Sequence, residues 1–456
     1  MKRTLIAGLA CTLCLAVAVP AFATRSRTNA LGAGNPATPN FIAGKVINEK
    51  ELTLTDSANT YHLPQLLVKY KNSVDTDASS NYNYGRFNIR YALTDEAVLW
   101  LYGISSKWEP VATSPSLGDG AGNFAAGDPA TVAGYGAGQE PTNHQLGPTN
   151  HQLGLGFGTN LGEALRVGAD LSIGGARADG TQQNLHNNTL IYFGAGLGFD
   201  LGEMNTLDFG LKIRFGSFNE RVNNVDDYLP DSLISFTLLG RGEFQVHQIA
   251  KLVPYVRFRL DSRNVVGSGS VDNQTGLNPN LKYGQLQDTI FQLGTDLAIS
   301  PAEKVLIQPG LGFAYRGSLL QGNAIDQENP GTKQPAPGGV VEEAYVLIPY
   351  YGFAAEAKAF DWLTLRFGAR QVIQQTNGNF NPPANQVKPP PNDQVPPSVE
   401  SHFSTVNNWL TAGVGINLRG WSIDININPQ FYNNAVFAVT GTGGVFGTDF
   451  AVTYDW

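Results

Sequence analysis

The chain has little cysteine, little charge and, past its first residues, no long hydrophobic run. Both cysteines, Cys11 and Cys14, lie in the first 23 residues, so the remainder has no thiol for a disulfide, a thiolate metal site or a nucleophile. No apolar run after residue 23 reaches the length of a membrane-spanning helix. Any membrane insertion of this remainder must therefore use strands.

Charged residues make up only 15% of the chain, and acidic residues outnumber basic ones. Without Lys2 and Arg3, 28 basic residues remain against 38 acidic ones, a formal charge of −10. A chain with this excess of negative charge is not expected to bind nucleic acid. The 52 glycines, 24 phenylalanines and 17 tyrosines, beside two methionines, are instead typical of an all-β protein.

The first 23 residues have the pattern of a secretory signal peptide. Lys2 and Arg3 precede an apolar run over residues 5–19, and Ala21-Phe22-Ala23 offers a small-x-small cleavage site. We therefore expect residues 1–23 to be removed and the protein to leave the cytoplasm.

Apolar residues alternate with polar ones in many segments, which is the period of a strand with one apolar face. Leu207 to Phe215 is the clearest case, with Asp208, Lys212 and Arg214 at the intervening positions. Sixteen segments are predicted as strands: 64–71, 84–92, 96–105, 150–160, 164–177, 188–200, 205–217, 232–247, 252–262, 286–299, 305–317, 343–359, 362–375, 404–418, 421–431 and 447–456.

Short and long connectors alternate between these segments. The short ones include residues 160–163 and 419–420, and the long ones include 106–149 and 376–403. This order is typical of an antiparallel transmembrane β-barrel with short turns at one rim and long loops at the other. We predict a barrel of 14 to 16 strands over residues 64–456, preceded by an arm, residues 24–63, that lies in the periplasm or plugs the lumen.

The last stretch alternates in the same way and ends on an aromatic residue. Phe450, Val452, Tyr454 and Trp456 share one face. This resembles the C-terminal signature of bacterial outer-membrane barrels that the barrel-insertion machinery recognises, so these four residues are the expected insertion signal.

Charged residues on the polar faces of the predicted strands must point into the lumen, because charges facing lipid are costly. Such residues are expected either to form structural ion-pair ladders that brace the wall or grip a plug, or to act as a selectivity filter. The candidates are Arg90, Arg166, Asp170, Asp208, Lys212, Arg214, Arg241, Glu243, Arg257, Arg259, Asp296, Arg366 and Arg370.

Some positions predicted to face inward are apolar, which suits a path for apolar molecules better than a water-filled pore. The same strip could equally pack against the N-terminal arm. The candidates are Leu99, Leu101, Tyr192, Leu239, Ile290, Ile348 and Tyr350.

No motif indicates an enzyme, a cofactor or a metal. The six histidines have no metal-ligand spacing, and there is no nucleophile elbow, phosphate loop or dinucleotide fingerprint. Residues 141–147 and 148–154 are a tandem copy of Pro-Thr-Asn-His-Gln-Leu-Gly, which indicates a duplication in a surface loop. A metal site at His144 and His151 is the less favoured alternative, since no acidic cluster lies nearby in the sequence.

Two pieces of the arm resemble the N-terminal region of the FadL family of hydrophobic-compound transporters and of related PorV-type barrels. Ala30 to Ala33 matches an Ala-Leu-Gly-Gly-Ala-like segment with one glycine replaced, and Asp56-Ser57-Ala58, Tyr61 and Pro64 match an Asp-rich stretch in which Leu63 replaces the usual Asn. The resemblance implies a barrel of about fourteen strands with the arm inside as a hatch. Hydrophobic substrates would enter near the outer loops and leave through the wall or past the hatch.

We therefore expect a passive channel or transporter for small, hydrophobic compounds in the outer membrane of a Gram-negative bacterium. Its expected partners are outer-membrane lipid, the barrel-insertion machinery and a hydrophobic small molecule. Two alternatives stay open: a structural or secretion-associated barrel that presents its loops to partners, and a general porin.

Overall fold

The computed structural model describes residues 25–32, 49–54, 56–79, 84–107, 149–179, 185–202, 204–220, 229–267, 282–323, 341–381, 399–427 and 447–456. The predicted signal peptide, residues 1–23, lies outside these ranges, and so do most residues of the long connectors, including 108–148 and 382–398.

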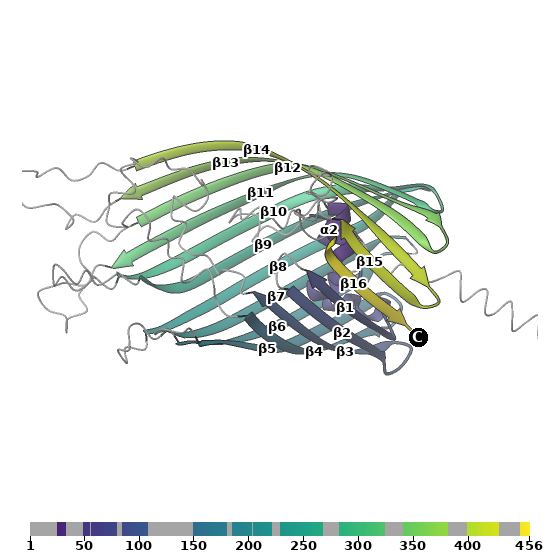
Figure 1. Cartoon of the computed structure of the whole chain (residues 1–456), viewed down its shortest axis with the longest axis horizontal. Helices are drawn as coiled ribbons and strands as arrows, with labels where there is room; N and C mark the ends of the chain where they lie inside the picture. The colour runs from purple at the N-terminus through teal and green to yellow at the C-terminus, as the bar shows by residue number, and fades with distance from the viewer. Residues whose placement is uncertain are drawn as a thin grey trace, which may run out of the picture.

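Sixteen antiparallel strands form one closed barrel, as the sequence pattern predicts (Figure 1). Consecutive strands pair around the ring, and β1 pairs with β16 to close it. The strands are β1 Ser73–Ser79, β2 Tyr84–Ala92, β3 Ala97–Lys107, β4 Thr149–Leu161, β5 Leu165–Asp179, β6 Leu185–Asp200, β7 Thr206–Glu220, β8 Leu229–His247, β9 Ala250–Gly267, β10 Lys282–Ala302, β11 Val305–Asn323, β12 Val341–Phe360, β13 Leu363–Asn381, β14 Val399–Leu418, β15 Trp421–Ile427 and β16 Gly447–Asp455.

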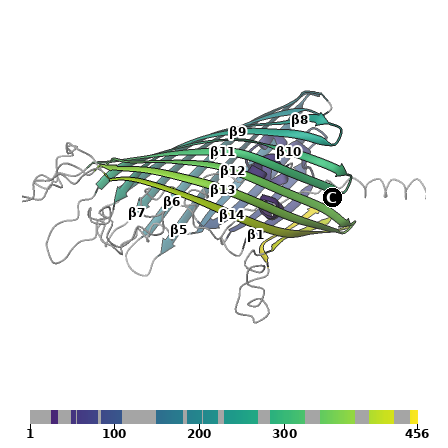
Figure 2. The same cartoon turned by 90° about the horizontal axis from the view of Figure 1, so that it is seen from above.

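Four short helical segments precede the barrel strands in the described ranges: α2 Arg25–Gly32, α3 Glu49–Thr53, η1 Ser57–Tyr61 and η2 Pro64–Lys69. None of the helices in the described ranges has the length and apolarity needed to cross a membrane. Figure 2, which views the barrel from above, shows the helical segments enclosed by the strands.

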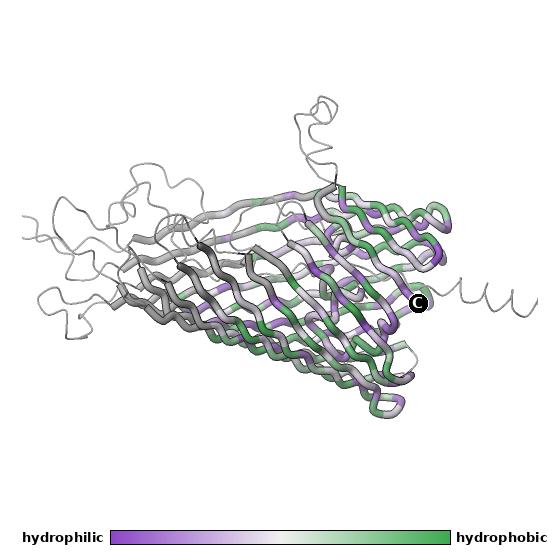
Figure 3. The backbone as a smooth tube through the Cα atoms, turned by 60° about the horizontal axis from the view of Figure 1, so that its bottom comes forward, coloured by the Kyte–Doolittle hydropathy of each residue, from purple (hydrophilic) through white to green (hydrophobic). Residues whose placement is uncertain are grey.

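Alternation decides which side chains face outward. On β7, Phe209 and Phe215 are 48% and 50% exposed, whereas Asp208, on the opposite face of the same strand, is 1% exposed. Green hydrophobic and purple hydrophilic positions alternate along the strands in Figure 3. The outer surface therefore carries the apolar side chains that a membrane-spanning barrel presents to lipid, and the polar partners point into the lumen.

The closing seam is regular over its whole described length. Its register runs from Ser73 opposite Asp455 to Ser79 opposite Asp449, without a bulge. The backbone N–H of Trp456 donates to the carbonyl of Asn72, 3.1 Å away, at the lower end of the seam. A closed ladder leaves no edge strand with unpaired backbone groups in the membrane.

The tight turns use backbone geometry suited to hairpins. Leu418 pairs with Trp421, so Arg419 and Gly420 form a two-residue connection. Both have positive φ, 47° and 88°, which is the geometry that matches the right-handed twist of paired strands. Glycine adopts this conformation without a steric penalty, whereas Arg419 is held there by the strands on either side.

The prediction of a strand over residues 64–71 is wrong. That segment is η2, and the first strand lies later, at Ser73–Ser79. Leu66, Leu67 and Val68 are consecutive and all buried, because a helical turn inside the lumen is surrounded on every side. The true first strand escaped notice because its outward residues, including Thr76 and Ala78, are not strongly apolar. The barrel wall therefore begins about nine residues later than predicted, while the strand count of sixteen is confirmed.

Candidate functional site

The principal feature of the lumen is the segment that fills part of it, which we call the lumen arm: residues 25–32, 49–54 and 56–70. Its helix α2 contacts β12 to β16, α3 contacts β9 and β10, and η2 contacts β3 to β6. Strand glycines make room for it. A Cβ at Gly168 would lie 2.4 Å from the backbone N of Gln65, and one at Gly368 would lie 2.6 Å from the carbonyl oxygen of Ala30. The wall is thus shaped to receive the arm.

The first anchor of the lumen arm is a chain of buried charges on α2. Arg27 donates from Nε and Nη2 to the two carboxylate oxygens of Glu356 on β12, at 2.7 and 3.1 Å. Arg366 on β13 donates to the same Glu356, at 2.7 Å, and to Asp424 on β15, at 2.5 Å. Bidentate and charge-assisted bonds of this kind fix orientation as well as contributing energy. The anchor therefore holds α2 in one position against three strands.

Asp56 joins the same anchor from the start of η1. Its carboxylate lies 3.5 Å from Nη1 of Arg27 and accepts the backbone N–H of Ala58 at 2.8 Å, while the side-chain oxygen of Asn59 accepts the backbone N–H of Asp56. This capping box satisfies the helix start. Burial raises the pKa of Asp56 to about 8, against the opposing effect of Arg27.

The second anchor is on α3. Lys50 is fully buried and donates from Nζ to Asp296 on β10, at 2.6 Å, and to the carbonyl oxygen of Gln308 on β11, at 2.9 Å. The hydroxyl of Thr53 and the side-chain amide of Gln308 donate to the same Asp296 oxygen, at 2.5 and 2.8 Å. Asp296 thus serves as the centre of a polar cluster that joins the arm to two strands.

The third anchor is aromatic. Tyr61 of η1 packs edge-on against Trp100 and Tyr102 of β3, with ring centroids 5.0 and 5.5 Å apart. Its hydroxyl donates to Asn88 on β2 at 2.5 Å, and the indole of Trp100 donates to the same oxygen at 3.0 Å. Asn88 in turn donates to Asp75 on β1, so this anchor reaches the closing seam.

Ion pairs also brace the wall itself. Arg166 pairs with Asp208 at 3.4 Å, Arg259 with Asp261 at 2.8 Å, and Arg316 with Asp288 at 2.9 Å. Arg241 pairs with Glu243, and Gln65 of the lumen arm donates to Asp208 at 3.1 Å. The ion pairs are the structural ladders expected from the inward charges, and Asp208 also binds the arm through Gln65.

The charged residues predicted to face the lumen all lie on the inner face, as the alternation of buried positions along each strand shows. They are Arg90, Arg166, Asp170, Asp208, Lys212, Arg214, Arg241, Glu243, Arg257, Arg259, Asp296, Arg366 and Arg370. Arg214 stacks over the ring of Tyr192 and Arg370 over the ring of Tyr350, at 5.3 and 5.2 Å to the centroids.

The apolar residues predicted to face the lumen fall into two groups, one that faces inward and one that does not. Tyr192, Leu239, Ile290, Ile348 and Tyr350 face inward. Leu239, Ile348 and Tyr350 belong to one buried cluster with four residues of the lumen arm, Leu52, Leu63, Leu66 and Tyr70. Of the two readings of this strip, packing against the arm is therefore the one that the contacts support.

The placement of Leu99 and Leu101 in the lumen is wrong. Leu99 is 41% exposed on the outer face, and the inward side chains of β3 are Val98, Trp100 and Tyr102, each at most 2% exposed. Both faces of β3 are apolar because the inner face packs against the arm, so the sequence pattern does not distinguish inside from outside there.

The terminal residues Phe450, Val452, Tyr454 and Trp456 face outward on β16 and beyond its end, as predicted, and Tyr454 lies 4.7 Å from Trp421 between ring centroids. The second copy of the tandem repeat enters β4 from residue 149, whereas His144 of the first copy lies outside the described residues. Within the described residues, no group of three or more His, Cys, Asp or Glu side chains is placed to hold a metal ion.

Sequence reasoning missed the arm residues that make the anchors, Arg27, Lys50 and Tyr61. Each is an isolated polar or aromatic residue in a segment without a period. The signal that could have found part of the arm is the Asp56-x-x-Asn59 spacing, which is a helix-start pattern.

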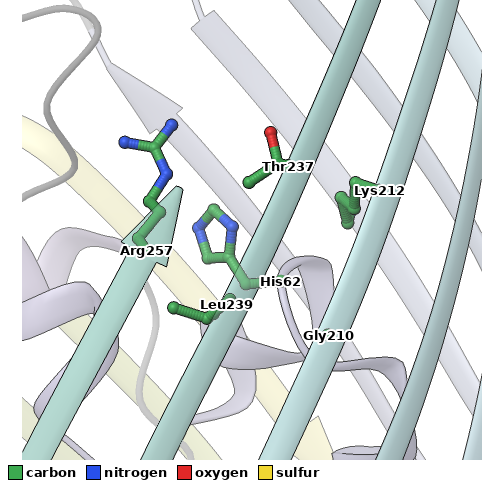
Figure 4. Close-up of a pocket in the computed structure, with 6 residues that line it drawn as sticks. All are labelled: His62, Gly210, Lys212, Thr237, Leu239 and Arg257. Carbon is green, nitrogen blue, oxygen red and sulfur yellow. The ribbon is translucent and has the colours of Figure 1, made fainter. Parts of the chain in front are cut away.

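A small cavity lies where the lumen arm meets β7, β8 and β9 (Figure 4). Its volume is about 10 Å³, near the minimum for one water molecule. The lining residues are His62, Gly210, Lys212, Thr237, Leu239 and Arg257. In Figure 4 the imidazole of His62, carried by the arm, projects toward the wall side chains of Thr237 and Arg257.

No protein-family model and no curated protein matches this chain. Among solved structures, the ferric yersiniabactin uptake receptor FyuA from Yersinia pestis matches 84% of this chain and 80% of its own length, at 8% identity and a TM-score of 0.37. The translocator domain of the autotransporter NalP from Neisseria meningitidis matches 65% of this chain and 89% of its own length, at 14% identity and a TM-score of 0.31. At these values nothing about ligands or transport passes from those proteins to this one.

Proposed function

We propose that this protein is a passive outer-membrane transport barrel for small compounds, and that the lumen arm is its gate. The observation that carries the proposal is the way the arm is held. Separate polar anchors at Glu356, Asp296 and Asn88 tie it to three parts of the wall. A segment held inside a closed barrel by discrete hydrogen bonds can be released without unfolding the strands around it.

The burial of the inner apolar strip supports a gate rather than a permanently open path. Leu239, Ile348 and Tyr350 are at most 6% exposed and pack against the arm. If the transported compounds are hydrophobic, as the resemblance to FadL-type barrels implies, they gain access to this strip only after the arm moves. Transport and arm movement are then the same event.

The proposal is tested by conductance in planar bilayers. A variant lacking residues 24–60 loses Arg27, Lys50 and Asp56, and its conductance should exceed that of the full chain. Heat-modifiable migration in gels checks that both barrels are closed. An unchanged conductance rejects the gate.

A matched control locks the arm instead of removing it. A Cβ at Gly158 would lie 2.9 Å from the Cβ of Leu67, so cysteines at these two positions can be joined after a small shift to the usual Cβ separation of about 3.8 Å. The chain after residue 23 has no other cysteine. Oxidation should suppress solute flux into liposomes, and reductant should restore it. A folded barrel that passes no solute in any of these forms would favour the structural alternative.

A further inference from the structure

The short-turn rim of β12 to β16 carries a group of aromatic side chains on its outer face. Phe360 and Trp362, at the β12–β13 turn, stack with ring centroids 5.7 Å apart and are 58% and 49% exposed. At the ends of β15 and β16, the ring of Tyr454 lies 4.7 Å from Trp421 and 6.2 Å from Trp456. Figure 1 places the C-terminus at the same rim as the short turns. Aromatic rings concentrate where lipid headgroups meet water, so this group indicates the level of a membrane surface.

Strand β13 sets the other limit of the membrane band. Its outward residues Leu365 and Phe367 are apolar and exposed, whereas the exposed Gln371 donates from its side-chain amide to Asn408 of β14, 2.9 Å away. Residues 363–371 match the roughly 9–11 residues that a strand needs to cross the hydrocarbon core. The aromatic group therefore lies at the boundary on the short-turn side, which faces the periplasm in outer-membrane barrels.

Exposed charges at this part of the rim have a positive excess, although the chain as a whole is acidic. In the described ranges, the short turns from β10–β11 to β14–β15 carry the exposed cations Lys304, Lys358 and Arg419 and the exposed acids Glu303 and Asp361. Asp361 lies 3.0 Å from Lys304 and 3.9 Å from Lys358, so one carboxylate is shared by two lysines.

Arg419 has no ion-pair partner among the residues that the structure describes. It is exposed in the two-residue turn between Leu418 and Trp421. Asp455, on the strand that pairs with β15, faces the lumen, because it alternates with the buried inward residue Thr453. The guanidinium of Arg419 is therefore available at the membrane surface, beside an aromatic ring.

We propose that Arg419 and the aromatic pair Trp421 and Tyr454 form a binding site for the headgroup of an anionic phospholipid in the periplasmic leaflet. The planar guanidinium matches two oxygens of a phosphate group, and Lys304 and Lys358 add to the attraction for negative charge. The acyl chains lie along the apolar outer face of β15. The inference concerns lipid alone and does not rest on the proposed transport.

The test is native mass spectrometry of the full-length barrel in detergent, titrated separately with phosphatidylglycerol and phosphatidylcholine. The first phosphatidylglycerol should bind about fivefold or more tightly than the first phosphatidylcholine, and Arg419→Gln should remove most of this preference. Lys251→Gln is the matched control, because Lys251 lies at the short-turn rim of β9, where the exposed neighbours Val246 and Ile249 are aliphatic. It should keep the preference of the parent. Heat-modifiable migration confirms that each variant is folded.

Equal affinity of the parent for the two lipids overturns the inference. A preference that survives in Arg419→Gln, or that is lost equally in Lys251→Gln, also overturns it, because the anionic lipid then binds elsewhere or by overall charge. Inorganic phosphate at millimolar concentration should not displace phosphatidylglycerol, since it has no acyl chains for the apolar face. Displacement by inorganic phosphate would identify a site for free anions and reject the assignment to lipid.

Discussion

The anchor at Lys50 gives the sharpest prediction for the gate. Lys50 and Asp296 are both at most 1% exposed and joined at 2.6 Å, so Lys50→Met leaves a carboxylate buried without its cation. Breaking one side of a buried pair costs about 3–5 kcal/mol. Asp296 keeps the bonds from Thr53 and Gln308, which places the expected cost near the lower limit. At about 1.4 kcal/mol per tenfold change, the population of released arm should rise roughly 10²-fold.

Cysteine labelling measures that population. Ser57 on η1 is 1% exposed, and Ser57→Cys is nearly isosteric, so it gives one thiol that reacts with a maleimide only when the arm leaves its site. When opening and closing are fast relative to labelling, the labelling rate follows the population of the open form. Lys50→Met in the Ser57→Cys background should therefore label roughly 10²-fold faster.

Two further variants separate this explanation from others. Combining Lys50→Met with Asp296→Leu removes both charges, so most of the slow labelling should return. Lys304→Met removes a cation from the exposed pair with Asp361 and should label at the parent rate. If Lys50→Met labels no faster than the parent, or if the double variant labels as fast as the single one, the buried pair does not hold the arm.

Three other predictions address different parts of the molecule. Gly168→Ala should displace η2 and raise conductance, because its Cβ would lie 2.4 Å from the backbone N of Gln65, whereas Gly85→Ala meets nothing closer than 3.9 Å and should behave as the parent. Burial raises the pKa of Asp56 from the ordinary 3.8 to about 8, so the arm takes up a proton when it binds inside the lumen. The arm should therefore bind most strongly below about pH 4 and progressively less strongly up to about pH 8, and the open probability of the channel should rise over that range. Asp56→Asn should abolish this pH dependence. Trp456→Ala should lower the fraction of heat-modifiable, inserted barrel if the terminal aromatic is an insertion signal, and an unchanged fraction would reject that role.

The sequence predicts the wall well because period-two alternation has a direct physical cause. From Leu207 to Phe215 on β7 every inward position is charged or glycine and every outward one is apolar, so the lumen positions of Asp208, Lys212 and Arg214 follow from the sequence. Where the inner face is apolar as well, as on β3, alternation carries no information, and Leu99 and Leu101 were placed on the wrong side.

The contacts of the lumen arm could not be predicted from the sequence in this way. Its contacts join residues far apart in the chain: Lys50 and Asp296 are 246 positions apart, and Arg27 and Glu356 are 329 apart. Strand alternation places Asp296 in the lumen, but no local pattern marks Lys50 or Arg27 as the arm residues that bind the wall. The segment Pro64–Lys69 was predicted as a strand because a helical turn buried on all sides has the same continuous apolar composition as a buried strand.

The enclosed arm has a consequence for the order of assembly. Its η2 turn contacts β3 to β6, near the beginning of the ring, and its α2 helix contacts β12 to β16, near the end. A segment that contacts both halves of the ring can bring them together before β1 and β16 pair, and its later release through the end of the lumen leaves the closed wall intact. In this role the arm is an internal template that brings the two edge strands together. A chain without the arm should therefore close its barrel more slowly during refolding into detergent.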